Sequence, residues 1–313
     1  MAETQAFDSE MERIGDALVA MREAFEPPAS MLAEAVEGLI LPEEAKLAIE
    51  AERFKASGPG RQAVEAALAH LVAGLAAEIE FRACEFDMRE VPTRFEKLIG
   101  LVSRSAMRRR QLARSRRSVS LDHLAELLRR ADRLAALVRA ERVTLLAQRS
   151  KGEADLKAFI DHRPDIIEKL HGENGEAMTG VEAARRTEHF VAVFQTFIDG
   201  LNAGVGTCNV LMHKLLIDVE DLLILYQVFS EVVSRYGDKD LRPEDFPNLF
   251  PEIERFSKGM LSVHGLDRRR DLANEAFAER FPAEAVRQAA AVAHPAGAGW
   301  RLPAISDLKF IRP

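Results

Sequence analysis

Apolar residues recur at spacings of three and four along most of this 313-residue chain. That period is typical of one face of an α-helix. The alternation of β-branched and polar residues that indicates strands is absent from the sequence. Aromatic residues make up only 6%, while alanine, leucine, glutamate and arginine are abundant, a composition that favours helices. The sequence therefore predicts an all-α protein, an elongated bundle of long antiparallel helices with coiled-coil-like packing and a less regular C-terminal region.

Proline and glycine predict three divisions of this chain. Residues 1–57 should form short helices, broken at Pro27-Pro28 and closed by Gly58-Pro59-Gly60. Residues 58–236 should form the elongated bundle. Residues 237–313, where prolines are frequent, should form short helices joined by irregular chain, for example a helix over 267–280.

The bundle should contain helices over residues 61–90, from 93 into the arginine-rich region, over 121–150 and over 181–236. Thr93 and Glu96 have the spacing of a capping box at the start of the second of these helices. Residues 207–235 form the most apolar segment and should be the centre of the core, with Leu215, Leu222, Leu223 and Leu225 inside it. Gly200, Gly204 and Gly206 should form a flexible joint between helices.

Charge is strongly segregated along the chain. Residues 1–100 carry ten Lys/Arg against twenty Asp/Glu, residues 101–150 thirteen against four, and residues 151–313 twenty against twenty-six. The three segments therefore have net charges of −10, +9 and −6, within a total of −7. An acidic chain with one basic segment is expected to present that segment to an acidic protein or an anionic surface.

The basic segment is concentrated between residues 103 and 118, which contain no acid and seven arginines: Arg104, Arg108, Arg109, Arg110, Arg114, Arg116 and Arg117. At about 100° per residue they surround a helix, so this helix cannot be packed in an apolar core. Either they form a solvated helix end balanced by the acidic N-terminal helices, or they bind an acidic protein or lipid surface. Nucleic acid is disfavoured because the chain is acidic overall and no aromatic residue for base stacking is evident nearby.

Other candidate positions have simpler structural explanations. Glu168 and His171 have the Glu-x-x-His spacing of di-iron bundles, but a second pair is missing from the sequence. His213, with Asp218 and Asp221, should be a satisfied core histidine. Cys84 and Cys208 should be reduced core residues. No metal site, cofactor or catalytic residue is predicted.

The sequence contains no glycine-rich phosphate loop, nucleophile elbow, His-Glu-x-x-His or Cys-x-x-Cys motif. The first hypothesis is a non-enzymatic helical-bundle protein that docks acidic partners through the arginine-rich helix end, and a homo-oligomer is left open. The alternatives are a membrane-active pore-forming protein, which would require rearrangement of its helices, and a nucleic-acid-associated bacterial regulator. The acidic start and the lack of an 18-residue apolar run lead us to expect a cytoplasmic protein, or one exported without a cleaved signal.

Overall fold

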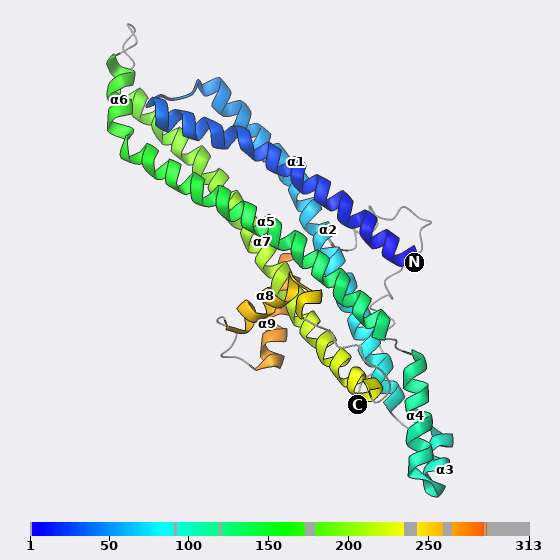
Figure 1. The fold of residues 1–313 in the computed structure, drawn as a ribbon. Helices are drawn as coiled ribbons and strands as arrows, with labels where there is room; N and C mark the ends of the chain where they lie inside the picture. The colour runs from blue at the N-terminus through cyan, green and yellow to red at the C-terminus, as the bar shows by residue number, and fades with distance from the viewer. Residues whose placement is uncertain are drawn as a thin grey trace. The chain divides into compact units, whose positions relative to one another are not determined.

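The computed structural model describes residues 2–90, 93–118, 121–172, 179–234, 243–258, 265–284 and 286. Of these residues 93% are helical and none lies in a strand, which confirms the all-α class (Figure 1). The order is α1 (Ala2–Gly38), α2 (Glu44–Glu90), α3 (Arg94–Val102), α4 (Arg104–Ser118), α5 (Leu121–Asp161), α6 (Arg163–Gly172), α7 (Gly180–Ser234), the 3₁₀ turn η1 (Pro243–Asp245), α8 (Leu249–Lys258) and α9 (Leu266–Arg280). Coiled-coil packing stays a prediction.

The chain divides into two compact units, each made from separate stretches of sequence. The first unit combines Met1–Leu68 with Arg139–Asn209, and the second combines Ala69–Val138 with Val210–Pro313. Helices α2, α5 and α7 each contribute residues to both units. The three-part division expected from the sequence stays a prediction.

Two helix breaks expected from proline are wrong. Pro27 and Pro28 lie inside α1, and Pro59 lies inside α2. An interior proline costs a helix about 3 kcal/mol because it removes a backbone donor and crowds the preceding turn. In α1 the apolar face continues across the proline pair, with Phe25 and Leu32 both buried, and burial of this face stabilises the continuous helix.

Some of the other helix boundaries agree with the sequence. Helix α2 ends at Glu90, ahead of Pro92, as expected. Helix α9 covers Leu266–Arg280, where a helix over 267–280 was expected. The predicted 181–236 helix is α7, which ends at Ser234. The helix expected to stop near Ser150 is longer, because α5 passes Gly152 and ends at Asp161.

Aromatic rings fill the core of the first unit. The Phe190 ring lies between Phe159 and Phe194, with centroid distances of 4.4 and 4.5 Å. Phe25 and Phe54 contact Phe197 at 5.8 and 5.4 Å. These contacts join α1, α2, α5 and α7, so rings that are far apart in the sequence form one apolar cluster.

The glycines of α7 are not a joint, because the helix is continuous through all three. A Cβ atom at Gly200 would lie 2.6 Å from Cζ of Phe54, and one at Gly204 would lie 3.0 Å from Cδ1 of Leu145. Gly206 is exposed and has open space around a Cβ position. Gly200 and Gly204 therefore allow neighbouring helices to approach α7 closely.

Alanine at these positions should have opposite effects. Gly206→Ala should raise the free energy of unfolding by about 0.4–1 kcal/mol, because alanine reduces the entropy of the unfolded chain and favours helix. Gly200→Ala should lower it by roughly 1–3 kcal/mol, because Phe54 must move. Urea unfolding of both variants measures the difference, and a gain in stability for Gly200→Ala would contradict the close packing.

The core of the second unit contains the apolar part of α7. Leu215, Leu222 and Leu225 are buried as predicted, whereas Leu223 is only half-buried. On α5, Leu124, Leu128 and six further apolar residues are buried: Ala125, Leu127, Ala131, Leu134, Ala135 and Val138.

A buried carboxylate connects α5 to the start of α8. Asp132 Oδ1 accepts hydrogen bonds from the backbone N–H groups of Asn248 and Leu249, each at 2.9 Å. Its Oδ2 accepts a third from the Asn248 side chain, also at 2.9 Å. Helix N-termini leave backbone donors without partners inside the helix, so Asp132 satisfies donors of a helix that is more than a hundred residues away in sequence.

Candidate functional site

The predicted capping box at the start of α3 is confirmed. Thr93 Oγ1 accepts a hydrogen bond from the Glu96 backbone N–H at 3.2 Å. Glu96 Oε2 accepts one from the Thr93 backbone N–H at 2.8 Å. This reciprocal pair satisfies donors at the helix start, and it leaves the Glu96 residue only 3% exposed.

The expectation of one helix running from Thr93 into the arginines is wrong, because Ser103 separates two helices. Its backbone is extended, with φ −151° and ψ 107°. Its N–H donates to the Ile99 carbonyl at 2.8 Å, the last helical hydrogen bond of α3, and its extended backbone then ends that helix. Its hydroxyl accepts from the Ala106 N–H at 3.3 Å, so the same residue caps the start of α4.

The two helices pack against each other as a hairpin. A Cβ atom at Gly100 would lie 2.6 Å from Sδ of Met107, so glycine at this position lets the Met107 side chain pack directly against α3. Further from the turn, Cζ of Arg110 lies 4.8 Å from the centre of the Phe95 ring, within cation–π range. We call residues 93–118 the basic hairpin (Figure 1).

The arginines of the basic hairpin are exposed wherever their side chains are described. Arg104, Arg108, Arg109 and Arg110 are all exposed. In the part of the chain that the structure describes, no carboxylate forms an ion pair with Arg104, Arg108 or Arg109. The backbones of Arg114, Arg116 and Arg117 continue α4, but their side chains lie outside the described part. Their role in partner binding stays a prediction.

Helix α3 also carries exposed apolar side chains, which were not among the site residues predicted from the sequence. Phe95, Leu98 and Leu101 are 56%, 61% and 83% exposed. Their spacing of three residues places them along one side of α3. The sequence does contain a pattern that could have indicated this surface, because large apolar residues recur at helical spacing next to the arginines. The expectation that no aromatic residue lies near the arginines is wrong, because Phe95 contacts Arg110.

The prediction that His213 is a core residue is wrong. His213 is exposed, and the two carboxylates grouped with it bind other cations. Lys214 Nζ donates to Asp218 Oδ1 at 2.6 Å. Asp221 is paired with Arg270 of α9. This helix face therefore carries ion pairs.

Burial raises the pKa of Asp218 from 3.8 to about 6, although Lys214 beside it acts in the opposite direction. A carboxyl with a raised pKa adds stability below its unfolded pKa and loses it as the pH rises through the folded pKa. Relative to Asp218→Asn, the wild-type free energy of unfolding should therefore fall by up to about 3 kcal/mol as the pH rises from below 3.8 to above about 6. Urea unfolding across this range measures the difference, and a constant difference would contradict the shift.

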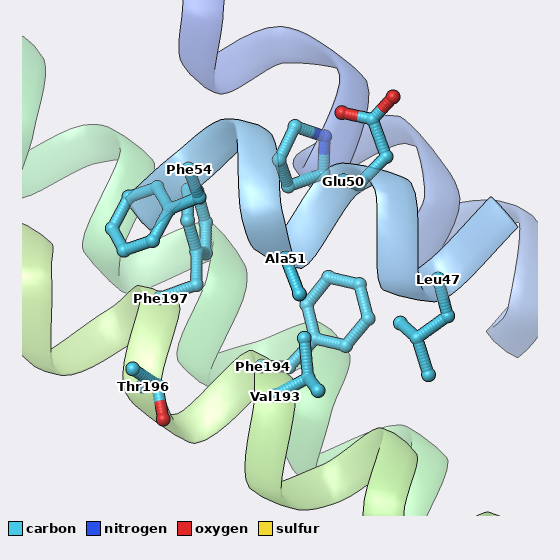
Figure 2. A pocket seen from close by; sticks show the side chains of 9 residues that line it. Leu47, Glu50, Ala51, Phe54, Val193, Phe194, Thr196 and Phe197 are labelled. Carbon is cyan, nitrogen blue, oxygen red and sulfur yellow. The ribbon is translucent and has the colours of Figure 1, made fainter. Parts of the chain in front are cut away.

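An apolar pocket lies in the first unit (Figure 2). Its empty volume is about 490 Å³, which includes open solvent, and α2 and α7 provide most of its walls. The lining residues are Pro28, Leu47, Glu50, Ala51, Phe54, Val193, Phe194, Thr196 and Phe197. Figure 2 shows Phe54 and Phe197 beside each other at one end. The lining contains a single ionisable side chain, Glu50, so the pocket offers no paired acid and base for catalysis.

The remaining candidate residues are the two cysteines and the Glu168–His171 pair. Cys208 is a buried free thiol, and burial raises its pKa to about 12. The side chains of Cys84 and His171 lie outside the described part, so the Glu168–His171 pair stays untested. Among the described residues, no group of three or more His, Cys, Asp or Glu side chains is placed to hold a metal ion.

Comparisons with protein-family models, with curated proteins and with solved structures find no match to this chain. Within the described helices, no 18-residue window is apolar enough and sufficiently poor in charge to cross a membrane. The basic hairpin is therefore the strongest candidate site on the evidence of its own geometry.

Proposed function

We propose that this protein is a non-enzymatic interaction protein that docks an anionic partner through the basic hairpin. The observation that supports the proposal is the exposure of Arg104, Arg108 and Arg109 without a carboxylate partner among the described residues. Arginines that stabilised the fold would be expected to form ion pairs within it. Arg22 is an example, because it binds the buried carboxylate of Glu141 at 2.7 Å.

The composition of the basic hairpin supports the same function. Residues 93–118 contain nine Lys or Arg residues and a single acid, Glu96, which is buried in the capping box. Positive charge is therefore not compensated within the hairpin itself. Such a surface attracts anionic partners over the Debye length, about 8–10 Å at ordinary salt concentrations.

Neutralising the described arginines should weaken partner binding without unfolding the protein. The variant carries Arg104→Gln, Arg108→Gln, Arg109→Gln and Arg110→Gln. Exposed charges each contribute less than about 1 kcal/mol to stability, so its melting temperature should stay close to wild type. On immobilised polyglutamate, wild type should require more salt for elution than the variant.

A control variant removes the same charge from other exposed positions. It carries Arg53→Gln, Lys55→Gln, Arg185→Gln and Arg268→Gln, whose side chains are 57%, 80%, 67% and 56% exposed. If it elutes with wild type, retention depends on the hairpin and not on net charge. Equal elution of all three proteins, or loss of stability in the hairpin variant alone, would contradict the proposal.

A further inference from the structure

The apolar side of α3 gives the basic hairpin a second property besides charge. Phe95, Leu98 and Leu101 expose more than half of their surface, and Leu101 is 83% exposed beside the turn. Large apolar side chains in water are unfavourable unless a partner covers them. A partner that fits this surface must accept apolar side chains and also carry negative charge close to them.

We infer that the basic hairpin docks on the surface of an anionic lipid bilayer, with Leu98 and Leu101 entering the boundary between headgroups and acyl chains while the arginines bind lipid phosphates. This inference rests on the proposed function and names its partner. Guanidinium groups bind phosphate oxygens through paired hydrogen bonds. Each basic residue near an anionic bilayer strengthens binding by roughly fivefold.

The shape of the hairpin favours a bilayer over a folded protein. The three apolar residues lie on the outside of a helix, so they form a ridge that inserts most easily into a deformable medium. The arginines of α4 are spread around their helix, as positions 104, 108, 109 and 110 require. Lipid headgroups can diffuse and reorient toward whichever arginines face the bilayer, whereas a folded partner would need carboxylates at matching fixed positions.

The dimensions of the hairpin also suit surface binding. Helix α3 has nine residues, and at 1.5 Å per residue it is about 13 Å long, too short to span a bilayer. Interfacial helices bury their apolar face only about 5–10 Å deep. Docking of this kind needs neither a membrane-spanning helix nor rearrangement of α7.

Vesicle flotation tests the inference with full-length protein. Wild type should bind mixed vesicles of phosphatidylcholine and phosphatidylglycerol, and should not bind phosphatidylcholine alone. The double variant Leu98→Gln/Leu101→Gln should lose at least about tenfold in affinity for the mixed vesicles, because its two side chains no longer enter the acyl boundary. The same variant should keep its retention on polyglutamate, since all arginines remain.

The control variant is Ile49→Gln/Val181→Gln, in which two residues with 65% and 81% exposure outside the hairpin are replaced. It should bind the mixed vesicles like wild type.

Wild type that is retained on polyglutamate but does not bind anionic vesicles would overturn the lipid inference. This result would indicate an acidic protein partner and leave the proposed function standing. Equal vesicle binding by Leu98→Gln/Leu101→Gln and wild type would also overturn the lipid inference. If wild type binds neither polyglutamate nor anionic vesicles, the inference and the proposed function are both rejected.

Discussion

Replacing Phe190 with alanine should lower the free energy of unfolding by about 3–5 kcal/mol, the usual range for removing a buried aromatic ring. Phe190 is fully buried, and its ring centroid lies 4.4 Å from that of Phe159 and 4.5 Å from that of Phe194. Removing the ring leaves a cavity between two other rings that are held by α5 and α7, so the site cannot collapse easily. Urea unfolding followed by circular dichroism measures the loss.

Two further variants separate the cavity from the loss of aromatic character. Phe190→Leu keeps most of the volume and should cost less than about 1.5 kcal/mol. Phe81→Ala removes a ring that is 48% exposed, so it should have a much smaller effect than Phe190→Ala. A loss below about 1 kcal/mol for Phe190→Ala would contradict its place in the core.

The period of the apolar residues was sufficient to predict the fold class, because a stripe at three- and four-residue spacing can be buried only by a helix. It was not sufficient to predict where helices end. Proline and glycine act locally, whereas Pro27 and Pro28 lie in a helix whose apolar face is buried on both sides of them. At Gly200 the missing side chain is a packing requirement, set by Phe54 from another helix. Neither the burial of α1 on both sides of its prolines nor the approach of Phe54 to Gly200 can be predicted from the local sequence.

The candidate site shows a similar limit. The charge of the arginines was evident from the sequence, but a single helix from Thr93 would have placed Phe95 and Arg110 about 22 Å apart along its axis. The turn at Ser103 instead brings them together, with 4.8 Å between Cζ and the ring centre. The sequence does not predict a turn at Ser103, because serine is common both in helices and at their caps. The combination of charge and apolar surface is therefore a tertiary property of the hairpin.

Replacing Leu222 with alanine should lower the free energy of unfolding by about 2–5 kcal/mol, because a fully buried leucine loses its contacts and leaves a cavity. Ile224 lies two residues further along the same helix but is 48% exposed, so Ile224→Ala provides a matched control. Alanine has the highest helix propensity, and neither substitution should therefore weaken α7 as a helix. The difference between the two variants in urea measures burial alone, provided that the slope of unfolding free energy against urea is unchanged. Equal small losses would mean that the apolar segment of α7 is not the core of its unit.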